Sequence, residues 1–204
     1  DVYKRQPQDQ DSLNPKMHPL SSIRAKASKF YRYVRQNIKP KPNPPTDYEA
    51  VQQAYAEGAL MKIRSGAAHA SLGANIDEES KLRAIKTAQF LISLPIQKDD
   101  VVVDYGCGTL RIGKHLIEYL DPSRYVGMDI NEEILATGLD LLDKSTIPIK
   151  QPILRKISQE SINSIAQLSP KFIFAKGVLQ HVPPSGIDQF FANIAEIANP
   201  NTLI

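Results

Sequence analysis

Two acidic residues and two glycines lie near the middle of this 204-residue sequence, at a spacing suited to binding a ligand. The β-branched run 101–103 is typical of a strand buried on both faces, and Asp104 ends that strand with a charge. Gly106 and Gly108 then allow a sharp turn because they carry no Cβ. Apolar residues at helical spacing follow, and a second short strand ends at Asp129. This order of elements predicts half of a nucleotide-binding α/β sheet.

The acidic residues indicate which kind of nucleotide this turn would bind. A dinucleotide-binding turn reads G-x-G-x-x-G, because a pyrophosphate must sit on the helix N-terminus. Here the position three residues after Gly108 is Arg111, and Asp104 stands two residues before the first glycine. An anion at that place would repel a pyrophosphate and attract a cation. The spacing therefore favours a ligand with a positive charge.

The stretch from Asp104 onward resembles motif I of the class I S-adenosylmethionine-dependent methyltransferases, in which an acidic residue precedes x-G-x-G-x-G. The resemblance implies that Asp104 lies near the methionine end of the cofactor S-adenosylmethionine. It also implies that the turn lines the cofactor by its backbone, at Gly106, Cys107 and Gly108. Asp129 matches the family's acid that accepts both ribose hydroxyls. Leu110 departs from the pattern, because it stands where the family usually has its third glycine.

A second point of resemblance is the run 177–183, Gly-Val-Leu-Gln-His-Val-Pro, after the expected fourth strand. In many small-molecule methyltransferases a Val-Leu-x-His-Val-Pro string forms one wall of the pocket. The resemblance implies that His181 lies close to the transferred methyl group, as the candidate general base. The alternative is a structural histidine that hydrogen-bonds the loop backbone. The family's frequent Asp in strand four is absent, since this strand reads Phe-Ile-Phe.

The resemblance implies further cofactor contacts at the ends of the expected strands: Ile130, Gln159, Glu160, Lys176 and Gly177. Family members often carry an acidic or amide residue after the third strand that meets the adenine amine. Ser158, Gln159 and Glu160 are all candidates for it. Glu160 has the alternative of only favouring the N-terminus of the next helix.

Asp104 also has two interpretations. A buried charge without a partner is costly, and Arg111 from the following helix could neutralise it. In the functional interpretation, Asp104 helps to hold the amino end of the cofactor's methionine, directly or through water.

The composition excludes several classes of protein. No apolar run approaches the roughly eighteen residues of a membrane span, and the first residues lack the apolar core of a secretory signal. The single cysteine, Cys107, excludes an internal disulfide and a cysteine-rich metal site. We reject Cys107 as a nucleophile, because it sits in the glycine turn. A cytoplasmic setting is the default expectation, and the sequence is expected to be a fragment because it starts without methionine.

The net charge of +3 conceals an asymmetry. Residues 12–46 contain eight Lys or Arg residues and no Asp or Glu, whereas the chain from Asp47 onward has a net charge of −4. Apolar residues recur at three- and four-residue steps over 20–39, which predicts a basic amphipathic helix. Such a helix could contact an anionic membrane or nucleic acid phosphates, or dock its apolar stripe on its own domain. The proline-rich stretch 40–45 predicts a linker.

The sequence as a whole predicts an α/β fold, a Rossmann-like class I methyltransferase sheet with helices on both faces, truncated at its C-terminus. Residues 1–46 are expected to be a disordered and helical extension with its linker, and 47–204 the methyltransferase domain. Within it, 47–98 would be a helical lid and lead-in and 99–204 the Rossmann-like core.

Several lead-in residues are candidates for the site or the core. Tyr48, Tyr55 and His69 could line the site, or pack or be solvated without a role there. The helix expected from about residue 78 to Pro95 should bury one stripe: Leu82, Ile85, Ala88, Gln89, Leu91 and Ile92.

The expected function is methyl transfer from S-adenosylmethionine to an unidentified, small-molecule acceptor. In this resemblance the cofactor supplies the activated methyl group, and the protein positions the acceptor behind it. One alternative is a non-catalytic protein that uses its basic extension to bind nucleic acid or a membrane. A nicotinamide-dependent oxidoreductase is disfavoured by Asp104 and Arg111.

Overall fold

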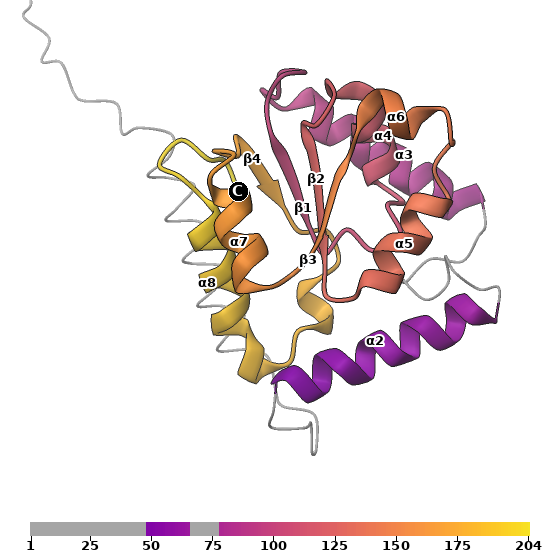
Figure 1. Ribbon diagram of the computed structural model, residues 1–204, viewed down its shortest axis with the longest axis vertical. Coiled ribbons are helices and arrows are strands. Elements are labelled where there is room, and N and C mark those ends of the chain that lie inside the picture. Colours follow the sequence, from indigo (N-terminus) through magenta and orange to yellow (C-terminus); the bar gives the residue numbers. More distant parts are fainter. Residues whose placement is uncertain (1–47, 66–77) are drawn as a thin grey trace, which may run out of the picture.

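The computed structural model describes residues 48–65 and 78–204 (Figure 1). The predictions for the extension 1–46, for His69 and for the side chain of Tyr48 lie outside the described residues. Four parallel strands form one sheet in the order β3-β2-β1-β4. They are β1 (Val102–Tyr105), β2 (Tyr125–Asp129), β3 (Ile153–Lys156) and β4 (Phe172–Phe174). A parallel bridge joins Leu203 to Phe172 of β4.

Helices cover both faces of this sheet, as the sequence predicted (Figure 1). The α-helices are α2 (Tyr48–Arg64), α3 (Glu78–Ser93), α4 (Gly113–Tyr119), α5 (Glu132–Asp140), α6 (Thr146–Lys150), α7 (Gln159–Ala166) and α8 (Ile187–Ile197). Two short 3₁₀ turns, η2 (Leu179–His181) and η3 (Pro184–Gly186), follow β4. Parallel strands joined by helices on both faces are the expected Rossmann-like architecture.

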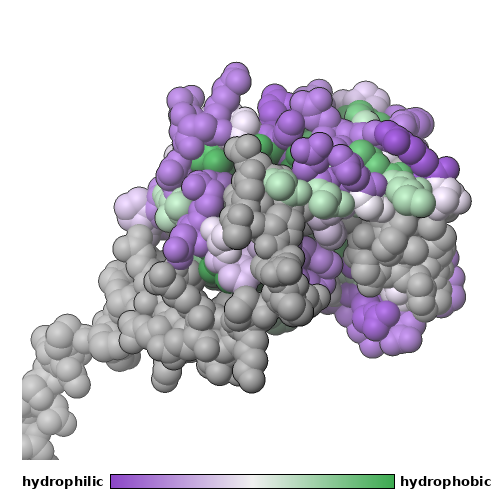
Figure 2. All heavy atoms as spheres, turned by 90° about the horizontal axis from the view of Figure 1, so that it is seen from below, coloured by the Kyte–Doolittle hydropathy of each residue, from purple (hydrophilic) through white to green (hydrophobic). Residues whose placement is uncertain are grey.

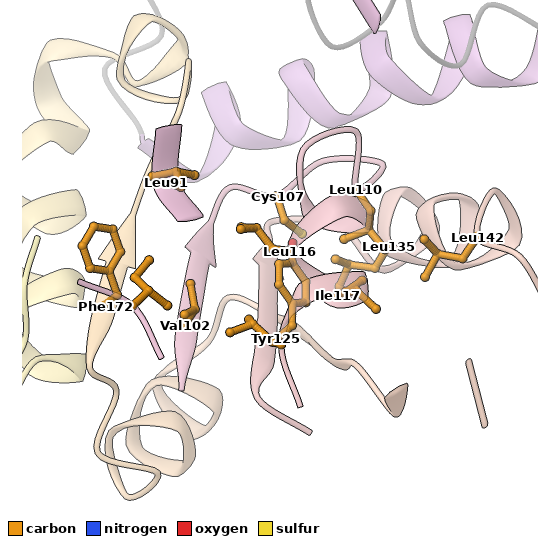
Figure 3. Close-up of a cluster of buried hydrophobic side chains, with 12 residues drawn as sticks. Leu91, Val102, Cys107, Leu110, Leu116, Ile117, Tyr125, Leu135, Leu142 and Phe172 are labelled. Carbon is orange, nitrogen blue, oxygen red and sulfur yellow. The ribbon is translucent and has the colours of Figure 1, made fainter. Parts of the chain in front are cut away.

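The core is divided between the two faces of the sheet because successive strand residues point to opposite sides. Val102 and Tyr125 pack with Leu116 and Ile117 of α4 in one cluster (Figure 3). On the opposite face, Val103 joins a second cluster with residues of α7 and α8. Both faces of β1 are therefore buried, as the β-branched run 101–103 predicted.

Two helices in the described part begin at side chains that satisfy free backbone N–H groups. The Asn131 side chain accepts hydrogen bonds from the N–H groups of Glu133 and Ile134, which starts α5 directly after β2. Ser158 forms a reciprocal capping box with Ser161 at the start of α7. These caps fix where the chain turns at the ends of β2 and β3.

The prediction for the apolar stripe of α3 was partly wrong. Ala88 and Leu91 are buried as expected, but Leu82 is 48% exposed and Ile85 is 36% exposed. The small residues Ser80 and Ala84 face the protein instead. Small residues are suited to close helix packing, and the hydrophobicity pattern does not register that preference. The short helix α6 was also missed, inside the segment expected to lead into β3.

Helix α2 crosses the lower ends of the strands and packs on α5 (Figure 1). Ala59 and Leu60 form a small buried cluster with Ile134. Beside it the Arg64 guanidinium pairs with the Glu133 carboxylate at 3.0 Å. This exposed ion pair contributes little by itself, so the apolar contact stabilises the position of α2 more than the ion pair does.

Two glycines provide a matched test of helix packing. A Cβ on Gly138 of α5 would lie 3.0 Å from the Leu110 Cγ and from the Thr109 carbonyl carbon, whereas a Cβ on Gly58 of α2 meets nothing within 4 Å. We expect Gly138→Ala to lower the free energy of unfolding by about 1–2 kcal/mol, since backbone must move. Gly58→Ala should raise it by about 0.5–1 kcal/mol through helix propensity. Urea denaturation measures both, and effects of the same sign would contradict this account.

Candidate active site

A cavity opens at the carboxyl ends of β1, β2 and β4, where ligands of parallel α/β sheets bind. Its floor is the end of β1 with the following turn, residues 104–109, and the end of β2 at Asp129 and Ile130. The segment 176–183 after β4 forms one wall, and α2 contributes Gln52 and Tyr55 to the opposite one. Four segments far apart in the sequence therefore enclose one space.

The turn after β1 is held against the end of β2 by its backbone. The N–H groups of Gly106 and Cys107 both donate to the Met128 carbonyl, at 2.8 and 2.9 Å. Gly106 has a φ of 85°, and a Cβ there would collide with Val178 of the segment after β4. Glycine is therefore needed for its backbone conformation and for the close approach of that wall.

Leu110 adopts the left-handed conformation at the place of the family's usual third glycine, with a φ of 61°. This conformation costs a non-glycine residue about 1–2 kcal/mol. The Leu110 side chain is 1% exposed, and burying a leucine stabilises by about 1.5–3 kcal/mol. The departure from the motif thus keeps the turn's geometry and adds a core contact.

Asp129 ties the two strands together through its carboxylate. Its Oδ2 accepts a hydrogen bond from the Gly108 N–H at 2.8 Å, and its Oδ1 accepts one from the Ile130 N–H at 2.8 Å. Burial raises the pKa of Asp129 to about 6, although these backbone donors oppose the change. A carboxylate has about four lone-pair sites, so acceptor capacity remains for a ligand.

Asp104 lies beside it at the end of β1 and is 3% exposed. Its Oδ2 accepts a hydrogen bond from the Tyr125 hydroxyl at 2.9 Å. Burial raises the pKa of Asp104 to about 7; the Tyr125 hydrogen bond opposes this and the nearby Asp129 charge adds to it. The alternative partner, Arg111, also lines the cavity, but no ion pair between described residues joins it to Asp104.

The site is electrostatically incomplete within the described chain. None of the ion pairs among residues 48–65 and 78–204 includes Asp104 or Asp129. The Thr109 hydroxyl, buried at the same cavity, has no hydrogen-bond partner in the described part of the chain. Buried carboxylates and an orphaned hydroxyl fit a ligand that brings positive charge and polar groups.

Burial also raises the pKa of the Cys107 thiol, and the charges of Asp104 and Asp129 add to this effect. The thiolate is the nucleophilic form of cysteine, so this environment disfavours nucleophilic chemistry at Cys107.

An aromatic pair closes the cavity from two directions. The rings of Tyr55 from α2 and His181 from η2 lie 4.7 Å apart between centroids, at an interplanar angle of 36°. Burial, with a smaller effect of the Asp129 charge, raises the pKa of Tyr55. Burial lowers the pKa of His181, which favours its neutral, proton-accepting form near pH 7.

Figure 2 shows the molecule from this end, where hydrophilic residues cover most of the described surface.

The structure brings most of the predicted site residues to this one cavity. Those lining it are Asp104, Gly106, Cys107, Gly108, Asp129, Ile130, Lys176, Gly177 and His181. Gln159 and Glu160 are absent from its lining, and Ile157 stands at that end of β3 instead. The Gln159 amide donates to Asn163 and Glu196 on the outer surface.

Sequence reasoning missed two polar groups of the site. Thr109 follows the second glycine of the motif, and its burial against the turn has no signature in the sequence. Tyr125 begins β2, four residues before Asp129, and the sequence indicated only that this segment forms a strand. The position of both residues at the site follows only from the packing of the helices on the sheet.

Comparison with known proteins agrees with this geometry. The model of a methyltransferase domain family matches residues 102–201. The chain carries a class I S-adenosylmethionine-dependent methyltransferase domain. A curated relative, a probable methyltransferase of Aspergillus luteorubrus, is 30% identical over 77 residues, which cover 38% of this chain and 27% of that protein.

A solved structure shows the same fold in a more distant protein. It is the magnesium protoporphyrin IX methyltransferase of Synechocystis with bound S-adenosylhomocysteine, which superposes with a TM-score of 0.55 at 16% sequence identity. The alignment covers 75% of this chain and 68% of that one. At this identity the likeness concerns the fold. No helix among the described residues is long and apolar enough to cross a membrane.

The buried carboxylates predict how stability depends on pH. The pKa of Asp104 in the folded protein is about 7, above its usual value. Its contribution to stability is therefore complete below about pH 4 and is lost as the pH rises through 7. Without ligand, we expect Asp104→Asn to raise the free energy of unfolding at pH 8 by on the order of 2–4 kcal/mol relative to the parent protein. At pH 4 the two proteins should have the same free energy of unfolding. Urea denaturation at each pH measures both values.

Exposed Asp121 supplies the control for this measurement, since Asp121→Asn should leave the pH profile unchanged. An Asp104→Asn protein that is less stable than the parent at pH 8 would contradict the assignment of Asp104 as an uncompensated buried charge.

Proposed function

We propose that this chain transfers the methyl group of S-adenosylmethionine to a small-molecule acceptor. The observation that carries the proposal is the pair of buried carboxylates, Asp104 and Asp129, at the ends of adjacent parallel strands. They face one cavity and have no cationic partner among the described residues. S-adenosylmethionine carries an ammonium, a sulfonium and two ribose hydroxyls, which these carboxylates could bind.

We assign the residues to parts of the cofactor as follows. Asp104 binds the ammonium of the methionine end, and the free acceptor sites of Asp129 bind the ribose hydroxyls. The turn lines the cofactor by its backbone at Gly106, Cys107 and Gly108. Ile130, Lys176 and Gly177 complete the cofactor contacts. We leave out Gln159 and Glu160, because neither lines the cavity.

The remaining wall residues position the acceptor and exclude water. The bound cofactor supplies a methyl group already activated for displacement. The Tyr55 and His181 rings and the half-buried Val178 surround the open part of the cavity, which supports an acceptor small enough to enter it. His181 is the candidate general base, because its lowered pKa keeps the imidazole neutral and able to accept a proton near pH 7.

This assignment also carries the proposed division of the chain. The domain spans 47–204, with α2 as its lid over the cavity, and residues 1–46 are a separate extension. One wall of the cavity then comes from the lid, α2, and the opposite wall comes from the segment 176–183 after β4.

The direct test is methyl transfer with an isotopically labelled cofactor. Incubation with a small-molecule cell extract, followed by mass spectrometry, should reveal one labelled product class that is lost in Asp104→Asn. Calorimetry should show binding of S-adenosylhomocysteine. Binding of NADH without binding of S-adenosylhomocysteine would overturn the proposal in favour of an oxidoreductase.

Substitution of Asp129 tests the ribose assignment. Asp129→Ala should weaken S-adenosylhomocysteine binding by about 1.5–3 kcal/mol, because hydrogen bonds to a charged acceptor are lost. Calorimetry gives the affinity, and circular dichroism must show that the turn still folds without the bond to Gly108. Asp140→Ala, on the exposed face of α5, is the matched control. Unchanged affinity in a folded Asp129→Ala protein would refute the assignment.

Substitution of His181 separates chemistry from cofactor binding. His181→Ala should lower the rate of methyl transfer by about 10²–10⁴-fold if it is the base, while S-adenosylhomocysteine affinity changes less than about threefold. His115→Ala, on α4 and outside the cavity lining, controls for loss of an imidazole. A His181→Ala protein with the parent's rate at saturating cofactor would leave the residue with a structural role only.

A further inference from the structure

The partner of Asp104 is a buried tyrosine that starts the neighbouring strand. In the parallel register Val102 lies opposite Tyr125 and Asp104 lies opposite Gly127, so all four positions share one face of the sheet. The Tyr125 hydroxyl reaches the Asp104 Oδ2, two positions further along, at 2.9 Å. Tyr125 is itself 2% exposed and packs with the core cluster shown in Figure 3.

Two glycines from different elements make room for this side chain. A Cβ on Gly127, in the same strand, would lie 3.1 Å from the Tyr125 Cε1. A Cβ on Gly113, the first residue of α4, would collide with the Tyr125 hydroxyl oxygen. The ring therefore lies over Gly127 and its hydroxyl against Gly113, which leaves it little freedom to turn away from Asp104.

The surroundings of the pair keep the Tyr125 hydroxyl protonated. Burial and the Asp104 charge raise the pKa of Tyr125 well above its usual value, so its hydroxyl stays protonated and donates. Oδ2 of Asp104 therefore accepts this hydrogen bond, whereas no described residue donates a hydrogen bond to its Oδ1. The carboxylate is held in one orientation with one oxygen available.

We propose that Tyr125 is a positioning residue for the cofactor: its hydroxyl orients the Asp104 carboxylate so that the second oxygen receives the ammonium of the methionine end. This inference rests on the proposed function, since it gives Asp104 the same ligand. It concerns a residue outside the cavity lining, which acts through Asp104.

Tyr125 should also set the pH range in which the cofactor binds. Its hydrogen bond lowers the pKa of Asp104, against the raising effects of burial and of the Asp129 charge. The other titratable groups around Asp104 are the Cys107 thiol in the turn and, along the cavity, Arg111, Lys176, Tyr55 and His181. A phenylalanine at position 125 changes none of these and removes only the donor.

The experiment titrates two ligands against the full chain between pH 6 and 9. S-adenosylhomocysteine carries the ammonium, and 5′-methylthioadenosine lacks the amino-acid end. In Tyr125→Phe, we expect S-adenosylhomocysteine affinity at pH 7 to fall about tenfold and to recover at high pH, with the midpoint shifted upward by about one unit. The affinity for 5′-methylthioadenosine should change less than about twofold.

The control and the second variant separate positioning from packing. Tyr119→Phe removes a tyrosine hydroxyl that donates to the Ile96 carbonyl on the far side of α4, and should leave both ligands unaffected. Gly113→Ala keeps Tyr125 and Asp104 but displaces the hydroxyl, so it should reproduce the upward shift.

Two outcomes would overturn the inference, and a third would remove the proposed function. The inference is overturned if a folded Tyr125→Phe or Gly113→Ala protein binds S-adenosylhomocysteine with the same pH dependence as the parent protein. If only one of the two variants folds, the result for that variant decides. An equal loss for both ligands also overturns it, because Tyr125 would then shape the whole pocket. Binding of neither ligand by the parent protein would instead remove the proposed function itself.

Discussion

Two carboxylates buried at one edge of a parallel sheet are the constraint around which this domain is built. Asp104 and Asp129 are 3% and 7% exposed, and both have pKa values raised by burial. Each is partly compensated by neutral donors, the Tyr125 hydroxyl for one and backbone N–H groups for the other. Neutral donors lower the cost of a buried charge without removing it, so the site is best compensated when a cation arrives.

The turn after β1 shows how the backbone serves this site. Gly106, Gly108 and Leu110 have positive φ, and the N–H groups of Gly106 and Gly108 donate to Met128 and Asp129 at the end of β2. The buried leucine at the last of them shows that a left-handed position does not require glycine when its side chain gains a core contact. Gly138 of α5 packs directly on this turn, so a helix beyond the site supports its conformation.

The cavity is completed by segments that lie outside the motif. Tyr55 from α2 and His181 from η2 approach each other over the floor formed by the acidic residues. Helix α2 packs on α5 through a small apolar contact with Ile134, away from the cavity.

The sequence by itself determined the architecture, and it predicted that the candidate site lies at the ends of the strands. Strand–turn–helix order, the β-branched run 101–103 and the acidic residues at strand ends are local signals, and the parallel sheet confirms the fold that they predicted. In contrast, the stripe of α3 was partly misplaced, because hydrophobicity does not report that small residues such as Ala84 pack closest.

Only the tertiary structure decided which groups meet. The partner of Asp104 is Tyr125, 21 positions away in the sequence, because the strand register and two glycines bring its hydroxyl there. Arg111 is closer in sequence, but it forms no ion pair with Asp104 in the described part of the chain. Gln159 follows β3 as the motif suggested, but it turns to Glu196 on the surface. Side-chain partners depend on distances between elements, and those distances are set by packing across the whole sheet rather than by any one segment.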